Sequence, residues 1–366
     1  MNDRQEKQLA FDRSVQNLTF GSLSGTGLTL EDLVCMDFRH KYVVKTYDSG
    51  LTATVFKVKT HRLFNYKKKR ATSLVKNIDG QTSFLNEIQR RIEFAELSET
   101  DSVIERHMVK TVYADYRQGV LLSEWIEGNH PATITESFVD QLLDVSFAMQ
   151  RKGTFEWDLC SGNLLIDPSG TLKLFDFGYC YRFDPLKEIN PEGLNAPMFH
   201  ALERFETRYS MFELLKIEEE NSLAQALKIY KMTKEVAIRH YSDHVLWLTD
   251  HHACAEVVDF FKALVNEWQA AIDSKENLYG LYKKEAIRSH ILDIHDDLAG
   301  QSCTVNTLKR LDAVLNWIVE DYDLLNSSDS FFWEDQSRTK DELVIHYESL
   351  RKPILQFQLL PKKTFE

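Results

Sequence analysis

The 366-residue sequence lacks closely spaced cysteines, a hydrophobic leader and any long apolar run. Its five cysteines are scattered and form no C-x-x-C pair. The first residues, MNDRQEKQLAF, contain no apolar core of a signal peptide. No uninterrupted apolar stretch approaches the length that crosses a membrane. These absences favour a reduced, cytoplasmic compartment, and they are equally compatible with secretion by another route.

Acidic residues outnumber basic ones: the chain has 44 Lys and Arg against 56 Asp and Glu, which gives a net charge of −12. This balance disfavours a general nucleic-acid binder, because phosphate backbones attract cationic surfaces. Nucleotide binding is still allowed, since it needs only a local cluster of donors. A hydrophobic content of 43 % predicts real cores, and the length predicts two domains or one bilobal unit with an extension.

The most informative stretch spans residues 155–178 and reads FEWDLCSGNLLIDPSGTLKLFDFG. Two short apolar runs, LLI and LKLF, flank the turn sequence DPSG, so the pattern predicts a β-hairpin. Asp158, Asn163 and Asp176 are expected at one end of its strands. Carboxylate and amide oxygens are the ligands that Mg²⁺ prefers, and a further carboxylate can take a proton from an attacking hydroxyl.

This stretch resembles the catalytic and metal-binding loops of the protein-kinase-like superfamily, H-R-D-x-x-x-x-N followed by D-F-G. Asp158 falls at the catalytic aspartate, Asn163 at the metal-binding asparagine, and Asp176 begins the D-F-G. The resemblance implies transfer of the γ-phosphoryl group of ATP to a hydroxyl. ATP and Mg²⁺ would be the cofactors, Asn163 and Asp176 would hold the metal, and Asp158 would deprotonate the acceptor.

The loop also departs from the protein-kinase pattern. Glu156 and Trp157 stand where the motif has His and Arg, and no lysine follows Asp158 by two positions. The sequence D-L-x-x-G-N is more similar to aminoglycoside, fructosamine and lipopolysaccharide-sugar kinases, whereas the D-F-G is closer to protein kinases. The acceptor therefore stays open between a protein Ser or Thr and a sugar or small molecule.

The resemblance implies an α+β, bilobal kinase-like fold. A small antiparallel-sheet lobe with one helix would come first, followed by a mainly helical lobe with a helical extension. The boundaries expected from the sequence are a lead-in (1–37), the small lobe (38–128), the core of the helical lobe (129–215) and the helical remainder (216–366). The last region could also bind a protein partner.

Residues 41–70 predict three short strands, because β-branched and aromatic residues recur between turn signals. In the resemblance, the first turn covers the nucleotide, with backbone N–H groups near Ser49, Gly50 and Thr52 facing the phosphates. Of the usual G-x-G-x-x-G only Gly50 is present, so an ordinary hairpin explains this turn equally well.

The third of these strands ends in FNYKKKR, which resembles the V-A-I-K of the family with Lys67 in the place of its lysine. Lys68 is the neighbouring alternative, since a slip of one residue swaps the faces of a strand. Residues 82–98 have apolar positions at helical spacing. The resemblance implies that a glutamate of this helix pairs with the strand lysine. Glu87 fits that place, and Glu93 is the fallback.

Two more strands are expected between residues 107 and 128, and the second ends in EWIEG, where the kinase hinge would lie. The resemblance implies that backbone groups near Glu124 and Ile126 bind adenine. From about Met198 the chain has helical spacing to its end. The histidines at 240, 244, 251 and 252 have no H-E-x-x-H motif or paired cysteine beside them, so they are interpreted as core or surface residues.

Two other functions remain possible from the sequence. One is a catalytically inactive kinase-like scaffold that binds a partner through its helical half; Glu156, Trp157 and the glycine-poor turn favour it. The other is transfer of AMP by the same fold. The presence of Asp158, Asn163 and Asp176 opposes the scaffold.

Overall fold

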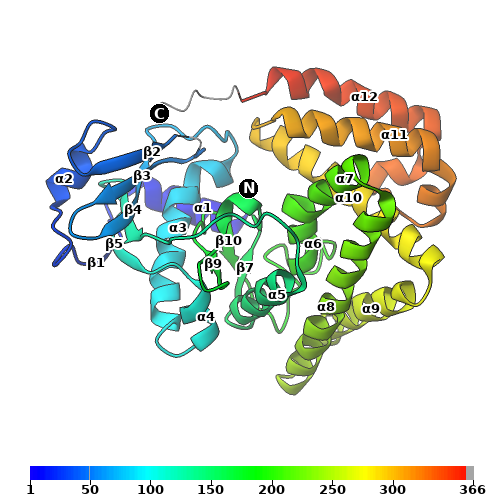
Figure 1. Ribbon diagram of the computed structural model, residues 1–366, viewed down its shortest axis with the longest axis horizontal. Coiled ribbons are helices and arrows are strands. Elements are labelled where there is room, and N and C mark those ends of the chain that lie inside the picture. The colour runs from blue at the N-terminus through cyan, green and yellow to red at the C-terminus, as the bar shows by residue number, and fades with distance from the viewer. Residues whose placement is uncertain (49, 360–366) are drawn as a thin grey trace. The chain divides into compact units, whose positions relative to one another are not determined.

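The computed structural model describes residues 1–48 and 50–359, which divide into two compact units. The first unit contains residues 1–130 and 162–180, and the second contains residues 131–161 and 181–359. The first is built on an antiparallel sheet and the second is mainly helical (Figure 1). The α+β class predicted from the sequence is confirmed.

A six-stranded antiparallel sheet forms the centre of the first unit, in the order β1-β5-β6-β4-β3-β2. Its strands are β1 (Thr19–Gly21), β2 (Val43–Tyr47), β3 (Ala53–Lys59), β4 (Leu63–Lys69), β5 (Thr111–Asp115) and β6 (Val120–Glu124). The three strands predicted between residues 41 and 70 are therefore β2, β3 and β4. The two strands predicted before the hinge segment are β5 and β6.

Helices cover both faces of this sheet. Alternate residues of a strand point to opposite faces, so each face carries its own apolar side chains for a helix to bury. One face packs on α2 (Leu30–Cys35), in a core that contains Leu33, Met36, Phe56, Val58, Phe64, Tyr66, Val120 and Leu122. The other packs on α3 (Ile78–Leu97), in a core that contains Ala53, Phe84, Leu85, Ile88, Ala114 and Leu121. The strand residues that point toward α3 are the ones available for the site described below.

The first 37 residues, expected as a lead-in, are part of the first unit. Helix α1 (Asp3–Arg13) packs against α3, where the Gln8 amide donates to the Asn86 side chain at 3.1 Å. Strand β1 pairs with β5 at the edge of the sheet. The segment therefore supplies an edge strand and a supporting helix.

The hairpin predicted between Asn163 and Asp176 is present as β8 (Leu164–Ile166) and β9 (Leu172–Leu174). The Asp167 carboxylate accepts the backbone N–H groups of Ser169 (2.8 Å) and Thr171 (3.0 Å), which closes the turn. Gly170 has φ +83°, a conformation that favours glycine. A short helix that the sequence did not predict, α4 (Ser102–His107), follows α3.

The second unit begins with α5 (Glu136–Arg151) and a two-stranded ribbon of β7 (Thr154–Glu156) and β10, which begins at the unit boundary (Cys180–Arg182). The following elements are α6 (Ala201–Phe205), a π-helical turn η2 (Glu206–Ser210), α7 (Met211–Glu220), α8 (Leu223–Asp250), α9 (Ala255–Ile272), α10 (Lys275–Gly300), α11 (Val305–Ser327), η3 (Trp333–Ser337) and α12 (Lys340–Gln356). Helix α11 packs between α10 and α12 (Figure 1). These helices match the helical series predicted after Met198.

Two of the histidines that the sequence analysis singled out have structural surroundings in this unit. The His244 ring is buried beside Phe147 and Phe261, with ring centroids 4.5 and 4.8 Å away. His240 is hydrogen-bonded to the Asp140 carboxylate at 2.9 Å. Their positions agree with an interpretation as core and surface residues.

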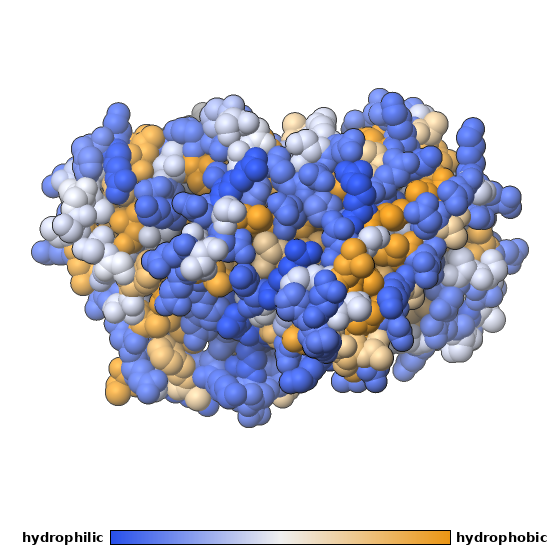
Figure 2. Space-filling view, turned by 90° about the horizontal axis from the view of Figure 1, so that it is seen from below, coloured by the Kyte–Doolittle hydropathy of each residue, from blue (hydrophilic) through white to orange (hydrophobic). Residues whose placement is uncertain are grey.

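None of the helices in residues 1–48 and 50–359 has the length and apolar character that a membrane crossing requires. Figure 2 shows a mainly hydrophilic face on which apolar residues gather in small groups. The large apolar side chains that are exposed are dispersed along the sequence, from Met1 to Leu355.

Candidate active site

A buried ion pair joins the sheet of the first unit to its main helix. The Lys67 ammonium, on β4, donates to both carboxylate oxygens of Glu87, on α3, at 2.8 and 3.0 Å. Only 6 % of the Lys67 side chain and 3 % of the Glu87 side chain are exposed. Arg91, one helical turn after Glu87, donates to the same carboxylate at 2.9 Å. Buried charges persist when they are paired in this way.

The register of β4 decides which lysine takes this position. Lys67 lies on the face of the strand that packs on α3, opposite to the face of Phe64 and Tyr66. Lys68 lies on the α2 side, where its ammonium donates to the backbone carbonyls of Val34 (2.6 Å) and Met36 (3.0 Å). The fallback residue Glu93 pairs with Arg90 instead.

Asp176, the first residue of the D-F-G, completes this cluster. Its Oδ2 lies 2.9 Å from the Lys67 ammonium, and 38 % of its side chain is exposed. Burial alone would raise the pKa of Asp176, but the charges of Lys67 and Arg91 outweigh it, and the pKa is lowered. Burial likewise opposes the charge of Lys67, whose pKa is nevertheless raised by Asp176 and Glu87. Asp176 and Lys67 are therefore both ionised at neutral pH.

Helix α3 also fixes the backbone of the D-F-G. The buried Asn86 amide donates to the carbonyls of Phe177 (3.2 Å), Gly178 (3.1 Å) and Cys180 (2.7 Å). The Phe177 ring is buried against Phe94, with ring centroids 4.8 Å apart. A side chain at Gly178 would come within 3.2 Å of Ser83 on α3, so the loop lies close to the helix. The position of Asp176 is thus set by α3.

Asn163 lies at the same end of the hairpin as Asp176. It directly precedes Leu164, which pairs with Leu174, and Asp176 follows Leu174 by two residues. Together they offer one ionised carboxylate and one amide carbonyl. This donor set fits Mg²⁺, which usually takes one or two carboxylates and completes its shell with water and phosphate oxygens.

The predicted phosphate turn between β2 and β3 is anchored by Arg70. Its guanidinium donates to the backbone carbonyls of Asp48 (2.8 Å) and Gly50 (2.9 Å) and contacts the Asp48 carboxylate. Its backbone N–H donates to the carbonyl of Thr52 at 3.0 Å. A side chain at Gly50 would come within 2.5 Å of the carbonyl oxygen of Ala53, so the turn requires glycine there. Ser49 lies outside the described residues.

The predicted hinge begins where β6 ends, at Glu124. The Glu124 N–H donates to the carbonyl of Lys110 within the sheet (2.9 Å), and its carboxylate faces Arg62 at 3.5 Å. Ile126 follows in a connection without regular secondary structure. Farther along, Asn129 forms a β-bridge with Ile166 of β8. The adenine contacts expected at Glu124 and Ile126 stay predictions.

Asp158 belongs to the second unit, where Glu156 and Arg208 surround it. The Glu156 carboxylate, at the position of the motif's His, accepts the backbone N–H of Asp158 at 2.8 Å. The Arg208 guanidinium donates to Asp158 Oδ1 at 2.9 Å. Trp157, at the position of the motif's Arg, packs against the ring of Phe199, with centroids 5.0 Å apart. The unusual residues of the loop therefore support its backbone.

Three residues that hold these side chains in place, namely Asn86, Arg91 and Arg208, were not predicted from the sequence. Arg91 is 1 % exposed. The signal that could have identified it is a charged residue among the apolar positions of the predicted helix. For Arg208 the signal was a second arginine, Arg204, four residues earlier in a helix with an otherwise apolar face. The catalytic and binding roles of all the residues that were named from the sequence stay predictions.

The family comparison agrees with the motif. Residues 31–190 match the family model described as the ABC1 atypical kinase-like domain. Over these residues the chain is similar to that family, which confirms the resemblance to the protein-kinase-like superfamily. The matched region includes Lys67, Glu87, Asp158, Asn163 and Asp176. No curated protein matches the chain.

Proposed function

We propose that the protein is an ATP-dependent phosphotransferase that moves the γ-phosphoryl group to a hydroxyl. The observation that carries this proposal is the cluster of Lys67, Glu87 and Asp176, in which a buried ammonium is held between two carboxylates. An inactive fold has no need to keep three charges in this arrangement, since buried ion pairs contribute little stability compared with apolar packing.

The first unit would bind the nucleotide. Lys67 is a compact cation on a rigid strand, suited to hold the phosphates, and Glu87 keeps it aligned. Asp176 and Asn163 would hold Mg²⁺. When bound, Mg²⁺ supplies positive charge that offsets the charge of the phosphates. The turn that contains Gly50 and Thr52 would cover the phosphates with backbone N–H groups, and the backbone at Glu124 and Ile126 would bind adenine.

The loop of the second unit would handle the acceptor. Asp158 would take the proton from the attacking hydroxyl. The hydroxyl oxygen then bonds to the γ-phosphorus as the bond to the bridging oxygen breaks, and ADP leaves with that electron pair. The acceptor belongs to one of two classes, a protein Ser or Thr or a sugar or other small molecule.

Labelled nucleotide tests the reaction class. The protein is incubated with Mg²⁺ and ATP labelled on either the α- or the γ-phosphate, and with Ser/Thr peptides or a set of sugars and aminoglycosides. We expect the γ-label on an acceptor or released as phosphate. Transfer of the α-label would instead indicate AMP transfer. No transfer of either label, with no stabilisation by Mg-ATP, would support the inactive scaffold.

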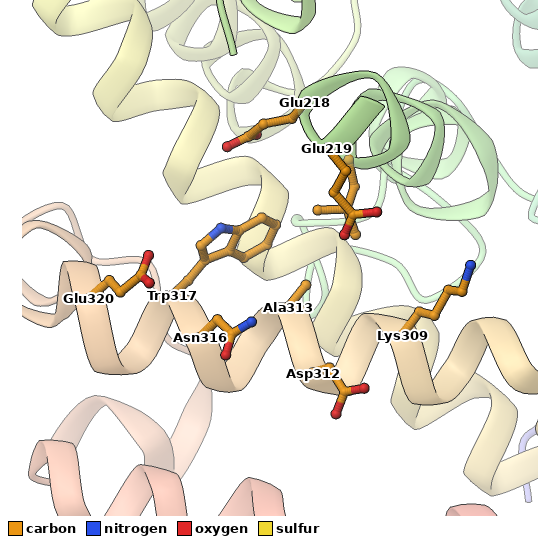
Figure 3. A pocket seen from close by; sticks show the side chains of 9 residues that line it. Glu218, Glu219, Lys309, Asp312, Ala313, Asn316, Trp317 and Glu320 are labelled. Atoms are coloured by element: carbon orange, nitrogen blue, oxygen red, sulfur yellow. The ribbon is translucent and has the colours of Figure 1, made fainter. Parts of the chain in front are cut away.

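Binding of a protein partner by the helical unit is a second candidate function, and one groove favours it. The groove has a volume of about 320 Å³ and lies between α7 and α11. It is lined by Leu215, Glu218, Glu219, Lys309, Asp312, Ala313, Asn316, Trp317 and Glu320. Figure 3 shows the Trp317 indole directed from α11 toward α7. Trp317 is 5 % exposed, and no hydrogen bond of its indole N–H is found within the described part of the chain.

Two of the four carboxylates already contact a cation of the same unit, Asp312 with Arg351 at 2.9 Å and Glu218 with Lys283 at 4.0 Å. Glu219 and Glu320, which form no ion pair with the described residues, make this groove complementary to a basic peptide segment. Such a segment would place Lys or Arg side chains against Glu219 and Glu320 and a backbone carbonyl on the Trp317 N–H. A labelled oligolysine peptide is therefore expected to bind, and the double variant Glu219→Lys/Glu320→Lys to weaken it about tenfold or more. Glu256→Lys, on α9, serves as the control. Equal binding of the peptide by the wild type, the double variant and the control would contradict the proposal. Displacement of the peptide by a polyamine of the same charge would also contradict it, because binding would then depend on charge alone.

A further inference from the structure

Arg208 connects the predicted catalytic aspartate to the helices of the second unit. It lies in η2, a five-residue π-helical turn between α6 and α7. Turns of this kind widen a helix locally and occur frequently at functional sites. From this turn the Arg208 Nε donates to Asp158 Oδ1 at 2.9 Å. Both side chains are largely buried, with exposed fractions of 24 % and 22 %.

The other branch of the Arg208 guanidinium binds Asp293, on α10. The second oxygen of that carboxylate lies 2.7 Å from Arg310, on α11. Arg310 also donates to the backbone carbonyl of Thr207, the residue before Arg208, at 3.1 Å. One carboxylate is therefore shared by two arginines, and the turn that presents Arg208 is fastened to α11.

This arrangement keeps the guanidinium charged and fixed. Burial would lower the pKa of Arg208, but Asp293 and Asp158 outweigh it and raise that pKa well above its ordinary value. A planar guanidinium with fixed donor directions restrains two carboxylates better than a mobile ammonium does. The orientation of the Asp158 carboxylate is thus tied to three helical segments.

The catalytic loop itself has no cation to do this. Its sequence D-L-C-S-G-N places Cys160 two residues after Asp158, where many Ser/Thr protein kinases carry a lysine. A cation from η2 contacts Asp158 instead, and it lies fifty residues later in the chain.

We propose that Arg208 is a positioning residue that holds the Asp158 carboxylate in the orientation required to accept the proton of the acceptor hydroxyl. This inference rests on the proposed kinase function. It assigns the helices after residue 200 a part in catalysis, because α10 and α11 hold Arg208 through Asp293 and Arg310. Proton transfer depends strongly on such orientation.

Replacement of Arg208 distinguishes a role in positioning Asp158 from a purely structural ion pair. The variants are Arg208→Gln, Arg208→Lys and Arg208→Ala, with Arg239→Gln as the control. Arg239 also contacts two carboxylates of the second unit, Glu136 (3.2 Å) and Asp140 (3.6 Å), but it does not touch Asp158. For each protein the release of γ-phosphate from Mg-ATP gives kcat and KM, and the thermal midpoint is recorded with and without Mg-ATP.

We expect Arg208→Gln to lower kcat about 100-fold while KM for Mg-ATP changes by less than about twofold, because only the proton-accepting group is misplaced. Arg208→Lys should recover part of kcat. Guanidinium chloride at about 50 mM, far below denaturing concentrations, should restore part of the activity of Arg208→Ala, whereas an equal concentration of sodium chloride should not. Arg239→Gln should behave as the wild type.

Three results would overturn the inference. They are a wild-type kcat in Arg208→Gln, a loss confined to KM or to the thermal midpoint, and equal effects of guanidinium and sodium chloride on Arg208→Ala. If Arg208→Gln does not fold, Asp293→Asn takes its place; it leaves the contact with Asp158 but loosens its support, and about a tenfold lower kcat is expected. A wild-type protein without turnover would overturn the proposed function itself, and this inference with it.

Discussion

In each unit, a cation that contacts an aspartate of the kinase motif is held between a pair of carboxylates. In the sheet-based unit Lys67 bridges Glu87 and Asp176. In the helical unit Arg208 bridges Asp293 and Asp158. In both cases one carboxylate belongs to a support element and the other to a loop of the kinase motif. Both clusters fix the side chain of an aspartate that lies on a loop.

The difference lies in the cation. Lysine offers a compact charge on a flexible stem, and Lys67 is positioned by the strand that carries it. Arginine offers a planar fork, and Arg208 is positioned by a π-helical turn and by a second arginine. A point charge suits the phosphates of a nucleotide, whereas a fork suits the restraint of a carboxylate. On this view the first cluster serves nucleotide binding and the second serves proton transfer.

The largest effect is expected at the aspartate of the second unit. Asp158→Asn keeps the shape of the side chain but cannot accept a proton, so kcat should fall about 1,000-fold or more. The stabilisation of the protein by Mg-ATP should persist, because the residues proposed to bind the nucleotide lie in the first unit. Rates of γ-phosphate release and thermal midpoints measure both quantities. Loss of Mg-ATP stabilisation in this variant would contradict the assignment of nucleotide binding to the first cluster and proton transfer to the second.

Replacement of the lysine should have the complementary consequence. Lys67→Met removes the cation proposed to bind the phosphates and leaves Glu87 and Asp176 without it, so kcat/KM should fall about 100-fold. The neighbouring Lys68→Met is the control, since the Lys68 ammonium donates to backbone carbonyls of the α2 segment and not to Glu87 or Asp176. Its turnover should stay within about twofold of the wild type. Similar losses in both variants would show that the register of β4 does not select the functional lysine.

Support of the D-F-G by α3 predicts a smaller effect. Asn86→Leu leaves three backbone carbonyls without their donor, which should cost about 2–3 kcal/mol of unfolding free energy and lower turnover about tenfold. Asn77→Ala, which removes the N-cap of the same helix, should cost about 1 kcal/mol without a specific loss of turnover. Urea unfolding and phosphate release are compared. Equal turnover in both variants would mean that Asn86 only stabilises the helix.

A pH prediction concerns a buried group that has no counter-charge. Burial, with a contribution from Arg151, lowers the pKa of His244 to about 3. The unfolded chain therefore binds a proton at His244 below about pH 6.5 that the folded chain does not bind. The stability that this provides is lost as the pH falls from 6.5 toward 3, by about 1.4 kcal/mol per pH unit.

His244→Phe fits between Phe147 and Phe261 and removes that proton. Urea unfolding at pH 6.0 and 5.0 should show a decline that is shallower in the variant by about 1.4 kcal/mol. The same decline in both proteins would indicate that the folded protein accommodates a charged imidazole at this position.

The sequence predicts those parts of the site that depend on the spacing of residues close together in the chain. The hairpin, the D-F-G and the helix glutamate are each specified by residues close together in the chain, and the match to the ABC1 atypical kinase-like domain confirms the superfamily. The choice of Lys67 over Lys68 needed the register of β4, which depends on the pairing of β3, β4 and β6.

The remainder depends on contacts between residues far apart in the sequence. Arg208 meets Asp158 from fifty residues away and Asp293 from eighty-five. Periodicity predicted the helices after residue 198 but not the extra residue in η2, which changes the direction of every side chain that follows. Likewise, the first 37 residues were expected as a lead-in, and the pairing of β1 with β5 makes Thr19–Gly21 part of the sheet.

The most direct test of the account is the effect of Mg-ATP on the thermal midpoint of the wild type and of Asp176→Ala. Binding of Mg-ATP to the folded state must raise the midpoint, since a ligand at 100 times its Kd contributes about 2.7 kcal/mol. We predict a clear increase in the wild type that requires Mg²⁺ and is absent in Asp176→Ala. An equal increase in both proteins, or none in the wild type, would contradict the assignment of Asp176 and the nucleotide site built around it.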